Sequence, residues 1–274
     1  MRVAVTNDDG VTAPGIRALA RAALARGWDV VVAAPAQEAS GSSAAMTAVA
    51  RDGRIAIEER SIEGLDATKV YAVAASPAFI TWLAVKGAFG PAPDVVLSGV
   101  NRGANGGYAV LHSGTVGAAL TAAGNGCRAI AVSLDVPTPT TPEAGSDIAA
   151  PASVDGDHDA RRHWHTAATF ATDMVPWLIE GPADTVLNLN VPDLPPERVR
   201  GLRRGGLARF GQVQMTVAEA GAGFVRMALT EVAEEVEHGT DLAWLTQGYA
   251  VVTPIRGVTE ARDVVVPLLT TGGR

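Results

Sequence analysis

The amino-acid sequence predicts an α/β protein in which a doubly wound, mostly parallel sheet lies between two helical layers, as a three-layer α/β/α arrangement. Three observations lead to this fold class. The chain opens with a strand-helix-strand unit, strand-like and helical segments keep alternating after it, and the runs VVLSGV and AIAVSL are apolar on both faces. Such alternation is typical of parallel sheets, whose strands are buried on both faces by the helices that connect them.

The opening unit sets the direction of the sheet. Arg2–Thr6 is rich in valine and reads as the first strand, and Ile16–Arg26 repeats apolar residues at helical spacing. Gly27 stands where a helix commonly ends, and Asp29–Ala34 is a second apolar strand, closed by Pro35. Because a crossover helix joins two parallel strands, this unit predicts a parallel sheet.

The rest of the chain continues the same pattern as one domain over residues 1–274. The further predicted elements are a hairpin at Asp52-Gly53, a strand at Val70–Ala74, a helix from Pro77 to about Lys86, a strand at Val95–Leu97, a helix at Thr115–Ala123, a strand at Ala129–Ser133, a helix at His163–Ile179 and a strand at Val186–Val191. Residues 135–159 are rich in proline, small and acidic residues, which predicts a mobile surface loop. From about residue 198, short strand-like runs between glycines predict a β-rich extension of the sheet.

Composition narrows the class of function. The net charge is −7 and the isoelectric point is about 5.2, which argues against binding to nucleic-acid polymers. No run approaches 18 apolar residues and the N-terminus lacks the order of a signal peptide, so we expect no membrane partner and a cytoplasmic location. Cys127 is the only cysteine, which excludes an internal disulfide, and we expect it to be buried.

The stretch Asn7-Asp8-Asp9-Gly10 places two carboxylates side by side directly after the first strand. Two adjacent ionised carboxylates repel each other, and one takes up a proton unless a cation lies between them. Mg²⁺ or Mn²⁺, which prefer oxygen ligands, would remove that conflict. Asn, Asp and Gly are also common turn residues, so from this stretch alone a metal site and an ordinary turn stay open.

Three loops with unusual polar content leave strand ends of the predicted sheet. They are Asn7–Gly10, Glu38–Ser43 and Ser98–Ser113. Ligands of doubly wound sheets bind in the crevice at the carboxyl ends of the strands, so we expect these loops to converge. In the third loop, Asn101 can offer an amide oxygen to a metal or an amide nitrogen to a phosphate, although a flexible turn is the other interpretation.

The segment His112-Ser113-Gly114-Thr115 stands at the start of a predicted helix. Free backbone N–H groups and the helix dipole make that end an anion site, and a plain N-cap role for Ser113 is the alternative. His112 adjoins the site and is a weak candidate for proton donation to a leaving group. No G-x-x-x-x-G-K-[ST] motif occurs in the sequence, which disfavours a P-loop.

Taken together, these residues resemble the SurE family of metal-dependent 5′/3′-nucleotidases, also called survival proteins. The resemblance follows the chain in order. It runs through MRVAVTNDDGVTAPGI, APAQEASGSS, SGVNRGAN, HSGTVGAAL, CRAIAVSL, LNLNVPDLP and GTDLAWLTQGYAVVTPI. It implies a Rossmann-like core with a protruding C-terminal region, here about residues 198–247, and a homodimer or homotetramer formed through exchanged C-terminal segments.

The resemblance also implies a set of site residues. One divalent metal per subunit, Mg²⁺ or Mn²⁺, would be held by Asp8, Asp9, Ser40 and Asn101. The phosphate of the substrate would contact Asn101 and the SGT segment, which here is Ser113, Gly114 and Thr115. Among these, Asp8, Asp9 and Ser113 are the candidate catalytic residues, together with the weaker candidate His112.

The chain departs from the family pattern at positions that flank the proposed site. Ser76-Pro77-Ala78-Phe79 stands where a Thr-Pro-x-Asp turn is expected, so an aromatic ring replaces a carboxylate. Tyr108-Ala109 replaces an acidic pair, and His112 replaces a tyrosine. Substrate preference and rate are therefore open.

The predicted function is hydrolysis of nucleoside monophosphates to nucleoside and phosphate by a metal-dependent 5′(3′)-nucleotidase, an acid-type phosphomonoesterase. Asp8 or Asp9 could accept the proton of the attacking water, and Ser113 as a nucleophile would depend on His112 for activation. A glycosyltransferase-like enzyme is a rival prediction, although it calls for a glycine-rich first loop where this one is doubly acidic. An inactive nucleotide- or phosphate-binding oligomer is the other alternative.

Overall fold

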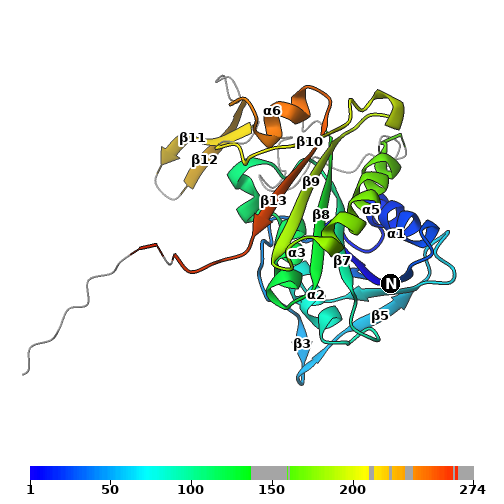
Figure 1. Cartoon of the computed structure of the whole chain (residues 1–274). Coiled ribbons are helices and arrows are strands. Elements are labelled where there is room, and N and C mark those ends of the chain that lie inside the picture. The colour runs from blue at the N-terminus through cyan, green and yellow to red at the C-terminus, as the bar shows by residue number, and fades with distance from the viewer. Residues whose placement is uncertain are drawn as a thin grey trace, which may run out of the picture.

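A nine-stranded sheet forms the centre of the protein in the computed structural model (Figure 1), which describes residues 1–136, 159, 161–209, 213–221, 224–231, 237–261 and 263–264. In spatial order its strands are β10 (Leu202–Arg204), β13 (Ala250–Arg256), β9 (Thr185–Pro192), β8 (Arg128–Asp135), β7 (Val95–Arg102), β1 (Arg2–Thr6), β2 (Asp29–Pro35), β6 (Lys69–Val73) and β5 (Ile57–Arg60). Neighbouring strands are parallel except β13 beside β9 and β5 beside β6. The predicted α/β fold class is confirmed.

Helices cover both faces of this sheet (Figure 1). Helices α1 (Pro14–Ala25) and α5 (Trp164–Glu180) pack with Val3 and Val5 of β1 in one apolar core. Helices α2 (Pro77–Val85) and α3 (Gly114–Gly124) pack with Ala4 in the other. Successive side chains of a strand point to opposite faces, so the apolar run of β1 supplies both cores and fixes the three-layer arrangement.

The strand order creates a switch point at β1. The chain proceeds from β1 outward to β2 and β6, and then returns to place β7 on the other side of β1. A crevice forms at the carboxyl ends of strands where the order reverses in this way. The fold therefore directs the loops that follow β1 and β7 into one ligand-binding position.

Local turn signals agree with the structure. Gly27 has φ of +74° directly after α1, and Asp52 and Gly53 have φ of +51° and +72° between β3 (Ala50–Arg51) and β4 (Arg54–Ile55). Positive φ at both central residues is what the type I′ turn of a two-residue hairpin requires. The predicted helix stop and the predicted hairpin are both confirmed.

Two strands differ from prediction. β7 continues to Arg102 through a register shift between Ser98 and Asn101, so Asn101 lies at a strand end rather than in a free loop. β5 was not predicted, because its sequence IEER is charged and exposed. Charged side chains are typical of an edge strand, where they discourage pairing with other chains.

The predicted loop at 135–159 falls mostly on residues 137–158, which lie outside the described residues. Its two ends are described and are both ordered parts of the fold. Asp135 closes β8, and Asp159 is buried with 6% of its surface exposed. These ends therefore belong to the body of the protein.

The C-terminal part divides between the main sheet and a separate hairpin. After the short helix η2 (Pro196–Arg198), β10 joins the edge of the main sheet, whereas β11 (Val213–Gly221) and β12 (Phe224–Glu231) form their own antiparallel pair that projects from the body (Figure 1). Helix α6 (Asp241–Thr246) then leads into β13. A role of residues 198–247 in oligomerisation stays a prediction.

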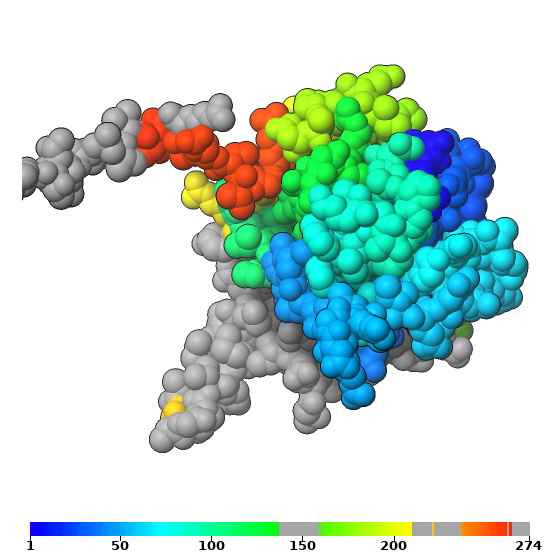
Figure 2. Space-filling view, turned by 90° about the horizontal axis from the view of Figure 1, so that it is seen from below, coloured from blue at the N-terminus to red at the C-terminus, as the bar shows by residue number. Residues whose placement is uncertain are grey.

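The segment that follows β13 leaves the body of the protein, as the orange-red residues of Figure 2 show. Cys127 is buried, as expected, with 5% of its surface exposed. Among the described residues, no helix is long and apolar enough to cross a membrane.

Candidate active site

The acid pair lies at the carboxyl end of β1, where the chain turns sharply. The side-chain amide of Asn7 donates to the carbonyl of Gly10 at 2.9 Å, and Gly10 has φ of +98°. Asn7 and Gly10 therefore form the turn, and Asp8 and Asp9 between them are left to other contacts. The three polar loops do converge here: the backbone N–H of Ala39 donates to the carbonyl of Asp8 at 2.8 Å, and the backbone N–H of Arg102 donates to the Asp9 carboxylate at 3.4 Å.

Asp8 points toward the start of α3. Its carboxylate accepts a hydrogen bond from the hydroxyl of Thr115, and only 4% of the residue surface is exposed. Burial raises the pKa of Asp8, although hydrogen bonds from the hydroxyl and backbone N–H of Thr115 oppose that rise. The N-terminus of α3 thus already faces one negative group of the protein itself.

Asp9 points to the other side of the turn. The backbone N–H of Arg102 donates to its carboxylate at 3.4 Å. Burial, and next the charge of Asp8, raise the pKa of Asp9 to about 8. The two carboxylates therefore carry an electrostatic conflict that their neighbours reduce only in part, and a bound cation would relieve it.

Asn101 contributes an oriented amide oxygen. Its side-chain nitrogen donates to the carbonyls of Arg102 at 3.1 Å and Gly103 at 2.8 Å, which fixes which way the amide points. The hydroxyl of Thr115, 3.2 Å from the oxygen of Asn101, also bonds to Asp8. Thr115 therefore contacts both Asp8, which follows β1, and Asn101 of β7.

The serine loop places two hydroxyl groups near the site, those of Ser40 and Ser42, and metal binding by Ser40 stays a prediction. Ser40 donates to the carboxylate of Glu38 at 2.6 Å. Ser42 lies near Asp8, because a Cβ on Gly114 would come within 2.7 Å of the Ser42 hydroxyl and 2.8 Å of the Asp8 carboxylate. The Ser42 hydroxyl is buried and has no hydrogen-bond partner among the described residues.

These groups fit a hard divalent cation. The buried carboxylate of Asp8, the half-buried carboxylate of Asp9, an oriented amide oxygen and a buried hydroxyl without a partner among the described residues are all oxygen donors, which Mg²⁺ and Mn²⁺ prefer. Within the described ranges, no three His, Cys, Asp or Glu side chains gather as a metal site. Two of the four candidate donors are neutral groups, so the set does not depend on a third acid.

Ser113 has the N-cap role that was the alternative to a phosphate contact. Its hydroxyl oxygen accepts from the backbone N–H of Val116 at 3.1 Å, which leaves the hydroxyl hydrogen to be donated. His112 is exposed at the end of η1 (Gly107–His112), and the described contacts give no hydrogen bond between its ring and Ser113. Catalysis by Ser113 or His112 stays a prediction.

Two buried asparagines, Asn188 and Asn190, fix the loop after β7 through Asn105. Asn105 receives a hydrogen bond from Asn188 at 2.7 Å and one from Asn190 at 3.0 Å on its carbonyl, and its backbone N–H donates to the Asn190 side chain at 2.8 Å. Its side-chain amide donates to Ser133 at 2.9 Å. The sequence reasoning assigned no role to these residues, although polar side chains in the apolar strand LNLN were a signal of one.

A pocket of about 190 Å³ opens beside Asp9. Its wall includes Glu38, Arg102, Asp159 and Trp164, none of which the sequence reasoning assigned to the site. Arg102 forms an ion pair with Asp159, a residue 57 positions away, and the local sequence gives no signal of such a contact.

The departures from the family pattern have structural roles. Ser76 donates to the carbonyl of Ala45 and accepts from the N–H of Thr47 at 3.1 Å, so it holds the loop that follows the serine segment. Phe79 stacks on Trp82 with ring centres 5.6 Å apart on α2. Tyr108 is 63% exposed, and its backbone N–H donates to Ala208.

The fold and this site together define a class: a doubly wound α/β protein with oxygen-bearing side chains gathered at the switch point of its sheet. Comparisons identify the family within that class. The family model described as Survival protein SurE matches residues 3–216, and the chain belongs to the SurE family.

Named relatives and one solved structure agree with this assignment. The 5′-nucleotidase SurE of Aeromonas hydrophila is 33% identical, with 93% of this chain and 92% of that protein covered. The 5′-nucleotidase SurE of Caulobacter vibrioides is 34% identical, with 93% and 90% covered. The crystal structure of the SurE protein from Aquifex aeolicus superposes with a TM-score of 0.68 at 28% identity and covers 93% of both chains.

Proposed function

We propose that this protein is a 5′(3′)-nucleotidase that hydrolyses nucleoside monophosphates with the help of one Mg²⁺ or Mn²⁺ ion per subunit. The observation that carries the proposal is the acid pair at the switch point, in which Asp8 is buried and Asp9 is half-buried, with pKa values raised above the ordinary range. The names of the relatives as 5′-nucleotidases support the substrate class. We expect a small nucleotide as substrate, a cytoplasmic location and a homodimer or homotetramer.

Asp8, Asp9 and Asn101 would hold the cation, and Ser40 or Ser42 would complete the set. When bound, a divalent cation supplies a Lewis acid that polarises a phosphoryl oxygen and neutralises developing charge. Thr115 orients Asp8 and Asn101 through its hydroxyl. These fixed contacts keep the donors in place before the substrate arrives, which lowers the cost of reorganisation during the reaction.

The start of α3 would stabilise the phosphoryl group. A Cβ on residue 114 would lie 2.8 Å from the carboxylate of Asp8. Because glycine has no Cβ, the backbone of Gly114 leaves room for a phosphate to approach the start of α3. The Ser113 hydroxyl has its hydrogen available for a phosphoryl oxygen. Either carboxyl oxygen of Asp9 can accept the proton of the attacking water at the open side of the turn.

Release of inorganic phosphate tests this function. The purified protein is incubated with AMP, GMP and 3′-AMP in Mn²⁺, and again after EDTA treatment. We expect release that EDTA abolishes and that Mn²⁺ or Mg²⁺ restores. An inactive binding protein would bind AMP without releasing phosphate, and a glycosyltransferase-like enzyme would leave the monophosphates intact but consume a sugar nucleotide. Absence of metal-dependent release from every monophosphate would refute the proposal.

A further inference from the structure

The pocket beside the acid pair lies on the side away from α3. Asp8 turns toward Thr115 and Gly114, whereas Asp9 accepts from the backbone N–H of Arg102 and lines the pocket. A substrate held at the acid pair with its phosphoryl group toward α3 would therefore direct its ester oxygen and leaving group into this pocket. The pocket is thus placed to receive the part of the substrate that is not phosphate.

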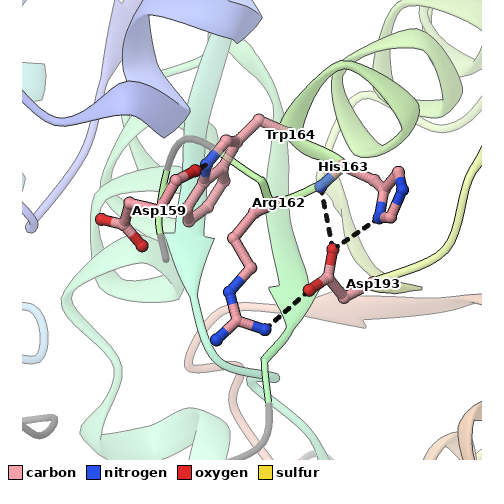
Figure 3. A network of polar contacts seen from close by, with 5 residues as sticks. All are labelled: Asp159, Arg162, His163, Trp164 and Asp193. Carbon is pink, nitrogen blue, oxygen red and sulfur yellow. Dashed lines mark hydrogen bonds and ion pairs between the residues drawn. The ribbon is translucent and has the colours of Figure 1, made fainter. Parts of the chain in front are cut away.

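An ion pair shapes the wall of the pocket. The guanidinium of Arg102 and the carboxylate of Asp159 form an ion pair, and the two side chains are only 16% and 9% exposed. The indole N–H of Trp164 donates to the backbone carbonyl of Asp159 at 3.0 Å, which fixes the position of that residue. Figure 3 shows that the carboxylate of Asp159 points away from Arg162 and Asp193, which form their own contacts.

Arg102 has hydrogen-bonding capacity beyond this pair. A guanidinium carries five N–H donors, and Asp159 is the one partner that the described residues give to the Arg102 side chain. Glu38, whose carboxylate also accepts from Ser40, adds acceptor oxygens to the same wall. The pocket thus offers fixed donors and acceptors at short range, together with the indole of Trp164.

This combination suits a sugar. Hydroxyl groups both donate and accept, so a carboxylate and a guanidinium can bind them at once, and an aromatic ring packs against the carbon face. The volume of about 190 Å³ lies below the roughly 300–1,000 Å³ of pockets that enclose a drug-sized ligand, so it fits one part of a nucleotide better than the whole.

We propose that this pocket is the sugar subsite of the enzyme, in which Arg102 contacts the hydroxyls of the ribose and Asp159 is the residue that positions Arg102. The inference rests on the proposed nucleotidase function and adds a determinant of preference for ribose esters over other phosphate esters. Trp164, which is buried with 7% of its surface exposed, holds Asp159 through its indole N–H.

The test compares esters that do and do not carry the sugar. Metal-dependent hydrolysis of AMP, ribose 5-phosphate and p-nitrophenyl phosphate is measured for the full chain and for Asp159→Asn and Arg102→Lys. We expect KM for the two ribose esters to rise about tenfold, the effect of one lost charge-assisted hydrogen bond, and KM for p-nitrophenyl phosphate to change less than about twofold. The matched control is Arg162→Gln, which breaks an ion pair at the same helix start but does not line the pocket.

Equal losses for all three esters would mean that the ion pair only maintains the fold or the metal site, and unchanged KM values would mean that Arg102 does not contact the sugar. Either result overturns the inference. In the unaltered protein, 2-deoxyribose 5-phosphate should show a higher KM than ribose 5-phosphate, and equal values would also contradict it. This comparison needs no variant and therefore holds if a variant fails to fold.

A binding measurement separates this inference from the proposed function. Adenosine has no phosphate group, so its binding to the pocket should not require the metal. Calorimetric titration should show that adenosine binds to the full chain and that Arg102→Lys raises the Kd for adenosine about tenfold. If no monophosphate is hydrolysed but adenosine binds in this way, the nucleotidase proposal fails and the subsite remains. If hydrolysis occurs but Arg102→Lys leaves adenosine binding unchanged, the subsite fails alone.

Discussion

Two carboxylate sites at the same edge of the sheet differ in how the protein compensates their charge. Asp193 follows β9 and accepts from the backbone N–H of His163 at 2.8 Å and from Arg162 at 2.9 Å, and the ring of His163 lies 2.9 Å away (Figure 3). Burial alone would raise the pKa of Asp193, but these hydrogen bonds and the Arg162 charge lower it. At Asp8 and Asp9 the pKa values are raised instead.

The comparison indicates at which site the protein itself compensates the carboxylate charge. The chain supplies Asp193 with donors from the start of α5, so this carboxylate ties α5 to the end of β9 and needs nothing further. The acid pair receives hydrogen bonds from Thr115 and the Arg102 backbone, which are too few for two adjacent charges. A site that the protein leaves electrostatically incomplete is the better candidate for binding a cation.

Replacing one acid of the Asp8-Asp9 pair should reduce the activity more than any other change considered below. Asp9→Asn should lower phosphate release from AMP by more than about 100-fold, because even groups that only support a metal ligand cost 10–100-fold when removed. Asp193→Asn should lower it less than about tenfold. The measurement is kcat/KM at saturating Mn²⁺ for both variants. Similar losses in the two would show that the contrast between the sites is not functional.

The next effect is on the pH dependence of stability without metal. The pKa of Asp9 is about 8 in the folded protein and 3.8 is the ordinary value, so the folded state holds its proton more tightly than the unfolded state. Stability of the metal-free protein should therefore fall by several kcal/mol as pH rises from about 4 to about 8.

Thermal unfolding after EDTA treatment, at pH 5 and at pH 8.5, measures this fall. Asp9→Asn should remove most of it, and added Mn²⁺ should restore the stability of the unaltered protein at pH 8.5. A pH dependence that is identical in Asp9→Asn would place its source elsewhere in the molecule.

A smaller change in stability is expected when Asp193 is replaced. Because the pKa of Asp193 is lowered on folding, this carboxylate adds stability above pH 4 that is lost as pH falls through its folded pKa. Asp193→Asn should destabilise the protein by about 1.5–3 kcal/mol at pH 7, the range for a hydrogen bond to a charged group, and by less at pH 3. Urea unfolding at the two pH values measures the difference. An equal loss at both would show that lost packing, and not charge, is responsible.

The sequence predicted what depends on neighbouring residues. The alternation of strands and helices predicted the layered fold, and the adjacent charges of Asp8 and Asp9 pointed to the site, because both signals lie within a short window. Gly27 and the Asp52-Gly53 hairpin were predicted for the same reason. Each of these rests on conformational or electrostatic preferences that a few residues determine among themselves.

The sequence could not predict what depends on tertiary contact. Asn105 reaches Asn188 and Asn190 across more than 80 positions, and Arg102 meets Asp159 only because the start of α5 packs beside β7. The choice between serines of the second loop also needs coordinates, since Ser40 turns to Glu38 while Ser42 lies near Asp8 in space.

The smallest predicted change in stability concerns Asp135, whose charge interacts with that of Asp193. Burial, and then the charge of Asp193, raise the pKa of Asp135 to about 6. An acid whose pKa is raised on folding costs stability as pH rises through that range, so Asp135→Asn should stabilise the protein by about 1–2 kcal/mol at pH 8 and by almost nothing at pH 4. Thermal unfolding of the variant measures the gain. In an Asp193→Asn background the gain should shrink, because the neighbouring charge is gone, and an unchanged gain would assign it to burial alone.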